Sequence, residues 1–412
     1  MHSNARDIVV FTGVSHAIIH TYELSIPILV VIWLLEFPVT TATLGIVVTV
    51  GYGLFGIGAL PGGVLADRFS ARTLIIAGLG GMGLSFLALS FAESVLTIAI
   101  ALGGWGIAAS VYHPAALSLI STGVRDRGTG FAYHGMAGNA GIALGPLLTA
   151  SLLILFDWQT VTRLLVIPTI GVIGYALTTD FDEMAAVNTD DERATDRSIS
   201  LSGFVADSRA LFTVGFLLAL GIVMMNGLFY RGTLTFLPEV LGEFLPPMGD
   251  LIQPSGEGSP VAEAFDTSSY LYAVLLTVGI GGQYVGGKLS DRLAPTRGLT
   301  VVFGSLVVIA IGFVPAARAG LPSLLLVSGL LGFFLFALQP LYQATIAEYT
   351  PPDGRGVSYG YTYLVSFGVG AAGAAIAGVL LSTFDVLGTL LTLSAFPAVG
   401  VVFSVLLSRW DD

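Results

Sequence analysis

Four histidines and one glutamate lie in stretches that are otherwise apolar. His16, His20 and Glu23 are spaced at i, i+4 and i+7, so on one helix all three side chains project from the same face. His113 and His134 lie in two further apolar stretches, at a depth similar to that of His16. A histidine titrates near neutral pH, so this set could accept and release a proton. Alternatively, these groups form a static hydrogen-bonded network that fixes helix packing.

Arg231 is the only basic residue well inside such a stretch. Because an arginine cannot lose its proton in a protein, its side chain must meet a carboxylate, an anionic substrate or water. Glu23 is a candidate partner, since we expect it at a comparable depth. Two alternatives stay open, in which Arg231 reaches the outer surface or pairs with Glu239 two turns along its own helix.

Other polar and aromatic residues also interrupt the apolar stretches. We expect them to face a central cavity and bind substrate together with Arg231, although any one of them could instead hold helices together. They are Tyr22, Tyr112, Asn139, Asn226, Tyr230, Gln283, Gln339 and Gln343.

The composition restricts the class of protein that carries these residues. Of 412 residues, 54% are hydrophobic and 10% are charged, whereas about 25% are charged in a soluble domain. This excludes a soluble enzyme. There is no Cys, which excludes thiol chemistry and Cys-ligated metal centres. The net charge of −11 and the lack of basic clusters exclude nucleic acid as a partner. Acidic loops with Lys288 as the single lysine resemble the proteins of salt-loving archaea.

The apolar stretches are long enough for membrane-spanning helices, which need about 20 residues each. A backbone in lipid must satisfy its own hydrogen bonds, and no alternating strand pattern suggests a barrel, so we predict an all-α membrane protein. The twelve predicted transmembrane helices cover residues 8–35, 40–65, 73–91, 95–120, 128–155, 160–179, 210–241, 268–288, 298–316, 321–347, 356–383 and 386–408.

The basic residues set the expected orientation. With the N-terminus inside, 13 of the 16 Lys and Arg residues fall in cytoplasmic segments or ends, and only Arg163 and Arg318 fall outside. We therefore expect a multi-pass protein of the plasma membrane with both termini in the cytoplasm.

The chain repeats internally. Residues 62–68, GGVLADR, return as residues 286–292, GGKLSDR, with five of seven identical. Pro114 is echoed by Pro340 at nearly the same offset. An even number of helices in each half makes this a parallel repeat, as in two-lobed carriers that rock about a central site. The predicted domains are an N-terminal six-helix lobe (1–179), a cytoplasmic linker (180–208) and a C-terminal six-helix lobe (209–412).

Residues 63–72, GVLADRFSAR, resemble the G-x-L-a-D-R-x-G-R-K loop of the major facilitator superfamily. On this motif the chain is identified as a member of that superfamily, although Ser70 and Ala71 depart from it. The resemblance implies the major facilitator fold and a cytoplasmic latch that holds the lobes together when the carrier opens outward. The latch residues implied are Gly63, Asp67, Arg68, Arg72, Gly287, Asp291 and Arg292.

Two further segments are similar to the fosmidomycin-resistance type of drug exporter within this superfamily. They are Tyr112-His113-Pro114, followed by Arg127-Gly128, and residues 138–146, GNAGIALGP. The Gly141-x3-Gly145-Pro146 portion also resembles the antiporter motif of proton-driven exporters. Gly138, Gly141 and Gly145 form a smooth strip on one helix face, which we expect at the seam between the rocking lobes. The arginine that related exporters carry in helix 4 is absent from residues 100–106, so the proton must be carried elsewhere.

These features predict a secondary active transporter that exports a small organic or drug-like molecule in exchange for protons. The alternative is ion-coupled uptake of a small anion through Arg231. An ATP-driven pump is excluded because Gly287-Lys288 is followed by Leu289, where a phosphate loop needs Ser or Thr. A membrane-embedded enzyme is disfavoured because no H-E-x-x-H motif occurs and no G-x-S-x-G motif precedes a catalytic triad. We expect no cofactor and no metal site, and as partners the lipid bilayer, a small-molecule substrate and protons. We expect a monomer.

Overall fold

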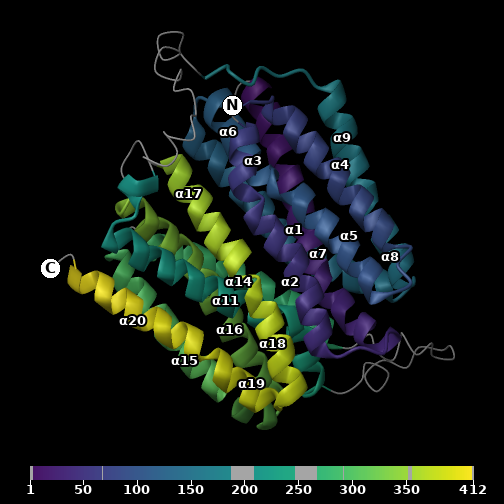
Figure 1. Cartoon of the computed structure of the whole chain (residues 1–412), viewed down its shortest axis with the longest axis vertical. Helices are drawn as coiled ribbons and strands as arrows, with labels where there is room; N and C mark the ends of the chain where they lie inside the picture. Colours follow the sequence, from purple (N-terminus) through teal and green to yellow (C-terminus); the bar gives the residue numbers. More distant parts are fainter. Residues whose placement is uncertain are drawn as a thin grey trace.

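The computed structural model describes residues 3–66, 68–186, 208–245, 267–290, 292–350 and 355–410, and within these ranges the regular structure is entirely helical. The first lobe contains α1 (Ser3–Glu36), α2 (Thr41–Ile57), α3 (Ala59–Ala66), α4 (Ala71–Leu89), α5 (Val95–Ser110), α6 (Tyr112–Gly123), α7 (Arg127–Leu153), α8 (Trp158–Leu164) and α9 (Val166–Thr178). The second contains α11 (Val214–Gly242), α14 (Thr267–Ser290), α15 (Pro295–Arg318), α16 (Leu321–Glu348), α17 (Arg355–Tyr363), the π-helical turn η3 (Leu364–Val369), α18 (Ala372–Thr383), α19 (Val386–Leu393) and α20 (Ala395–Trp410). The two lobes lie side by side (Figure 1).

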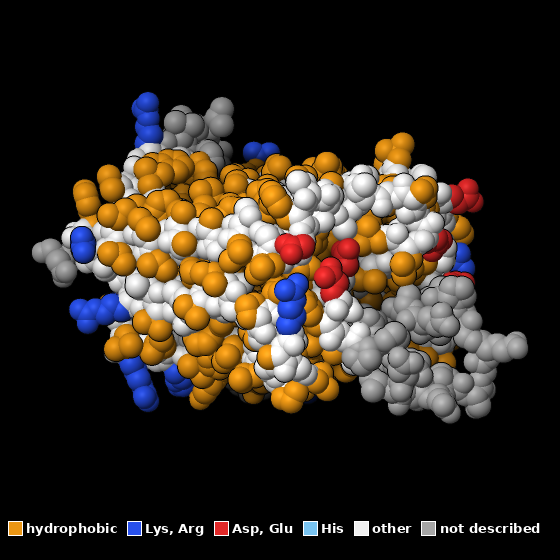
Figure 2. All heavy atoms as spheres, turned by 90° about the horizontal axis from the view of Figure 1, so that it is seen from below, with side chains coloured by type: hydrophobic (Ala, Val, Ile, Leu, Met, Phe, Trp, Pro, Cys, Tyr) orange, Lys and Arg blue, Asp and Glu red, His pale blue; other side chains and the backbone are white. Residues whose placement is uncertain are grey.

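The prediction of an all-helical membrane protein is confirmed. In the described part of the chain, 11 helical stretches are long and apolar enough to cross a membrane. The remaining predicted span, 268–288, is present as the 24-residue helix α14. Figure 2 shows one face of the molecule, on which hydrophobic side chains cover a broad area and Lys and Arg side chains gather toward one end. Such a surface suits contact with lipid.

Several spans that we predicted as continuous helices are interrupted. The breaks at Gly58, Val111, Leu165 and Ser394 each lie three residues before a proline, namely Pro61, Pro114, Pro168 and Pro397. A proline has no N–H to donate to the carbonyl four residues earlier, and its ring crowds that carbonyl, so the helix bends at this point. The break in the eleventh span is different, because η3 there forms a π-helical turn.

The contact between the lobes runs along α2 and α18. The Thr41 hydroxyl donates to the carbonyl of Gly378 at 3.1 Å, and the Thr49 hydroxyl donates to the carbonyl of Ala371 at 2.9 Å. A Cβ added to Gly45 would lie 2.5 Å from the Ala374 carbonyl oxygen. The absence of a side chain therefore lets the two backbones come together at this seam.

The glycine strip of α7 lies elsewhere than predicted. A Cβ added to Gly145 would lie 2.6 Å from the Cα of Thr21 on α1, and Gly138 and Gly141 face α1 in the same close way. Pro146 lies inside α7, directly after Gly145, and is buried. The prediction that this strip lies between the lobes is wrong, because its close partner is α1 of the same lobe. Its small residues bring α1 and α7 together and so position the histidines that these two helices carry.

Candidate functional site

A buried ion pair joins the two lobes. The Arg231 guanidinium on α11 donates to Oε1 of Glu23 on α1, and the two side chains are only 3% and 2% exposed. Among the described residues, Glu23 is the one carboxylate that pairs with Arg231. Of the three sequence-based alternatives for this arginine, the structure therefore shows the pairing with Glu23, and not a surface position or a pairing with Glu239.

Aromatic rings surround the guanidinium. The Cζ atom of Arg231 lies 3.8 Å from the ring centroid of Tyr52 on α2 and 5.4 Å from those of Tyr230 and Phe367. The negative face of an aromatic ring attracts a cation, and this attraction is stronger where water is excluded. Tyr52 and Phe367 were not predicted as site residues, because an aromatic residue in an apolar span gives no sign of which way it faces.

Besides its ring contact with Arg231, Tyr52 makes a hydrogen bond to the backbone of α1, and a proline in α1 explains it. Pro27 lies within α1 and has no N–H to donate to the carbonyl of Glu23, four residues earlier. The Tyr52 hydroxyl donates to this carbonyl instead, at 3.0 Å. The spacing of Pro27 from Glu23 could have indicated a free carbonyl at this position, although not its partner.

The histidines continue the polar network from Glu23 along α1. Nδ1 of His20 lies 2.6 Å from Oε2 of Glu23, and Nε2 of His20 lies 3.0 Å from Nε2 of His16. Nδ1 of His16 in turn lies 2.8 Å from the backbone carbonyl oxygen of His134 on α7. The predicted ladder on one face of α1 is therefore present as a connected chain of polar atoms.

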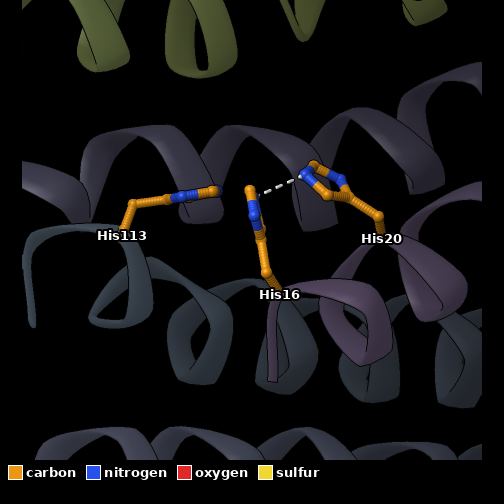
Figure 3. Close-up of side chains that lie close together, drawn as sticks. All are labelled: His16, His20 and His113. Atoms are coloured by element: carbon orange, nitrogen blue, oxygen red, sulfur yellow. Dashed lines mark hydrogen bonds between the residues drawn. The ribbon is translucent and has the colours of Figure 1, made fainter. Parts of the chain in front are cut away.

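His113 and His134 share the depth of His16, as the sequence indicated. The ring of His134 is stacked on that of His16 at a centroid distance of 4.0 Å, and the ring of His113 lies 5.2 Å from it. His113 also stacks against Tyr363 of the second lobe at 5.4 Å. In Figure 3, His16 lies between His113 and His20, which approach it from opposite sides. The cluster therefore belongs to the first lobe but touches the second.

Two tyrosines predicted to line a cavity contribute to the core of the first lobe. The Tyr22 hydroxyl is within 2.6 Å of the Thr169 hydroxyl on α9, and the residue is fully buried. The prediction that Tyr22 faces the space between the lobes is wrong, because α9 belongs to the same lobe. Tyr112 is also buried, donates to the Thr12 carbonyl and stacks on His16, so it supports the histidine cluster.

The remaining predicted substrate-binding residues do not form one group. In the second lobe, Nε2 of Gln283 donates to Oε1 of Gln339 at 2.9 Å, which links α14 to α16. Asn226 is 7% exposed, and its Oδ1 has no hydrogen-bond partner among the described residues. Asn139 is half-buried on α7, whereas Gln343 is exposed.

The comparison with known families decides the class of protein that carries this site. A family model described as Major Facilitator Superfamily matches residues 14–375. The chain belongs to this superfamily. It is a membrane transporter and not an enzyme.

Relatives of this major facilitator protein cover most of its length. An uncharacterized MFS-type transporter of Bacillus subtilis, YfnC, is 23% identical over 404 residues, which is 96% of this chain and 91% of the relative. A gallate transporter of Pseudomonas putida is 27% identical over 391 residues, or 90% of this chain and 84% of the relative.

Solved structures share the fold. A bacterial homologue of the human lysosomal transporter Spinster, in an inward-facing and unoccupied conformation, has a TM-score of 0.74 at 14% identity and covers 99% of this chain and 98% of its own. A point mutant of the nucleoside transporter NupG has a TM-score of 0.75 at 11% identity and covers 99% of both chains.

The superfamily's loop motif lies partly outside the described residues, since both Asp67 and Asp291 do. Arg68 and Arg292 are exposed. A Cβ on Gly63 would meet open space, and one on Gly287 would meet Pro340 at 3.9 Å. The latch stays a prediction.

Arg72, the last residue of the predicted latch, makes its contacts within its own lobe. It donates to the Ala176 carbonyl, and its guanidinium lies 5.0 Å from the ring of Phe181. In this structure Arg72 therefore ties the start of α4 to the end of α9 rather than to the second lobe.

The histidine cluster has a geometry that the sequence motifs did not indicate. His16, His20 and His113 each offer one nitrogen, and these three atoms lie within 4.8 Å of one another. We expected no metal site because H-E-x-x-H is absent from the sequence. In the folded chain the third histidine comes from a different helix, α6, which a search for local motifs cannot find.

Proposed function

We propose that this major facilitator protein works by alternating access and exports a small organic or drug-like molecule in exchange for protons. The observation that carries the proposal is the buried pair of Glu23 and Arg231, because each lobe supplies one of its two charges. When two lobes rock apart at such a point, both charges lose their partner. Leaving a buried charge without its partner costs about 3–5 kcal/mol.

Movement therefore requires a replacement for one of the charges. A proton on Glu23 would release Arg231, and the polar chain through His20 and His16 supports a route for that proton along α1. Hydrogen-bonded imidazoles can pass a proton between their two ring nitrogens. Proton entry and the separation of the lobes would then be one coupled event.

The second candidate function is ion-coupled transport of a small anion. An anionic substrate could replace Glu23 at Arg231, where the rings of Tyr52 and Tyr230 would contact an aromatic acid. The name of the Pseudomonas putida relative, a gallate transporter, supports this candidate. Resemblance to the fosmidomycin-resistance type, carried by Tyr112-His113-Pro114, supports export.

The remaining expectations about the cell follow from the same proposal. We place the protein in the plasma membrane as a monomer, with both termini in the cytoplasm and with Asp67 and Arg68 in a cytoplasmic latch. The segregation of basic residues along the sequence supports this orientation.

The experiment that tests the proposal is transport in proteoliposomes. A panel of organic cations, neutral drugs and aromatic carboxylates is loaded, and a pH gradient is imposed in each direction. Proton-coupled export predicts accumulation on the side with the higher proton concentration, reversed when the gradient is reversed. Accumulation of carboxylates alone, on the side with the lower proton concentration and beyond that in liposomes without protein, would favour the anion carrier. Transport of every compound at the same rate with and without the gradient would contradict proton coupling.

A further inference from the structure

The hydrogen bonds of His16 and His20 fix where their ring protons lie. Nδ1 of His16 lies 2.8 Å from the His134 carbonyl oxygen, which can only accept, so this nitrogen carries a hydrogen. Nδ1 of His20 lies 2.6 Å from a Glu23 carboxylate that is already paired with Arg231. An ionised carboxylate also only accepts, so Nδ1 of His20 carries a hydrogen as well.

The second ring nitrogens, Nε2 of His16 and Nε2 of His20, then point their lone pairs at each other. A neutral imidazole has one donor and one acceptor nitrogen, so both Nε2 atoms are acceptors. They lie 3.0 Å apart, a distance at which two acceptors repel unless an electron-pair acceptor binds to them. The position requires a cation, which can be a shared proton or a metal ion.

The position of His113 favours a metal ion over a shared proton. Its Nε2 atom is buried and has no hydrogen-bond partner among the described residues, and His113 is one of the three histidines whose nitrogens lie within 4.8 Å of one another. A proton shared by His16 and His20 gives the ring of His113 nothing to bind. A metal ion would use it, because imidazole nitrogen binds zinc at about 2.0–2.1 Å in a tetrahedral site that holds three protein ligands and one open position.

We propose that His16, His20 and His113 bind one divalent transition-metal ion of the kind that imidazole prefers, such as zinc. The groups behind the ligands are those of a metal site, since metal-binding histidines usually donate their second N–H to a carboxylate or a backbone carbonyl. Glu23 has this position behind His20, and the His134 carbonyl has it behind His16. This inference does not depend on the direction of transport, but a bound ion would occupy the Nε2 atoms of His16 and His20 and so close the proton route proposed above.

The site also connects the metal to the seam between the lobes. Glu23 supports His20 with one carboxylate oxygen and holds Arg231 with the other. His113 lies against Tyr363 of the second lobe. A bound ion would therefore stiffen the part of the first lobe from which Arg231 must separate.

The test uses full-length protein without a polyhistidine tag, stripped with a chelator and titrated with cobalt(II). Cobalt(II) reports a four-coordinate nitrogen site by its visible absorption, and zinc(II) should displace it. We expect one cobalt ion per chain. His113→Asn should weaken cobalt affinity at least tenfold, and Glu23→Gln should weaken it about 10–100-fold because it removes the support of His20. Glu36→Gln is the matched control for Glu23→Gln and should retain wild-type affinity, because Glu36 lies on the same helix but accepts from Trp158 and Gln159 and not from a histidine.

The outcomes separate a metal site from a shared proton. If the wild-type protein shows no saturable cobalt binding, the two histidines share a proton and the proposal is wrong, whatever the variants do. If His113→Asn and Glu23→Gln both bind cobalt as tightly as wild type and Glu36→Gln, the three-histidine site is also wrong. Thermal unfolding and gel filtration of each variant exclude loss of binding through misfolding, and His20→Gln replaces His113→Asn where that variant does not fold.

Discussion

The first helices of the two lobes show how far the repeat has diverged. On α1 the buried acidic or basic residues are His16 and Glu23, with the less buried His20 between them, whereas α11 has Arg231 as its buried acidic or basic residue. The helices correspond in place, but their chemistry is opposite in sign. Each lobe supplies one charge to the pair of Glu23 and Arg231. The comparison indicates that the first helices of the two lobes differ in their ionisable groups, and that these groups are complementary.

The fifth helices of the lobes differ in a second way. In the first lobe, α7 runs unbroken for 27 residues, and its glycines pack against α1. In the second lobe the equivalent span is divided into α17, η3 and α18. Gly368 of η3 lies close to Gly56 of α2, and Gly370 lies close to Gly227 of α11. The irregular backbone therefore lies in the second lobe, where that lobe meets the first.

We expect the largest loss of stability when one of the two opposite charges that join the lobes is removed. Arg231→Ala leaves Glu23 buried without its partner, so we expect a loss of stability of about 3–5 kcal/mol, measured by unfolding in detergent. The double variant Glu23→Gln/Arg231→Gln removes both charges and should recover part of that loss. Arg163→Ala, at a position outside the ion pair, is the control. Equal stability of Arg231→Ala and wild type would show that the pair does not hold the lobes together.

A smaller effect is expected where α7 packs within its own lobe. Gly141→Ala places a Cβ against the Ala17 carbonyl, and overpacking of this kind costs about 1–3 kcal/mol. Gly171→Ala on α9 has open space for its Cβ and should be neutral or slightly stabilising. Melting temperatures of the two variants measure the difference. If both behave alike, the close approach of α1 and α7 is not needed for the fold.

The smallest effect concerns the carbonyl that Pro27 leaves free. Tyr52→Phe keeps the ring beside Arg231 but removes the hydroxyl that donates to the Glu23 carbonyl. A buried acceptor without a partner costs about 1–3 kcal/mol, and we expect the lower end because the rest of the ring stays in place. Tyr284→Phe, at a side chain 68% exposed, should leave stability unchanged. A Tyr52→Phe protein as stable as this control would mean that the hydroxyl contributes nothing to α1.

The sequence predicted the helices well because long apolar stretches separated by polar loops leave little choice in a membrane. It did not predict the breaks within them. Pro61 and Pro114 follow breaks, whereas Pro27 and Pro340 lie inside unbroken helices, so the packing around each proline decides the outcome. No proline accompanies η3, and its residues carry no pattern that indicates a π-helical turn.

The site was predictable to the extent that depth along a helix determines proximity. Counting residues from the helix ends brought Glu23 and Arg231 to one level and the histidines to another, and the structure shows these groups in contact. Rotation of a helix about its axis is not fixed by such counting. Tyr22 was therefore placed toward the wrong neighbours, and Tyr52 was missed.

The most direct test of the central claim, that Glu23 couples proton movement to the separation of the lobes, is transport by Glu23→Gln in proteoliposomes. Accumulation of substrate driven by a pH gradient is compared with exchange of labelled for unlabelled substrate without a gradient. We predict that Glu23→Gln loses accumulation but retains exchange, whereas Glu239→Gln, a change to a carboxyl two turns from Arg231, retains both. If Glu23→Gln still concentrates substrate against its gradient when a pH difference is imposed, Glu23 has a structural role only, and the coupling site lies elsewhere.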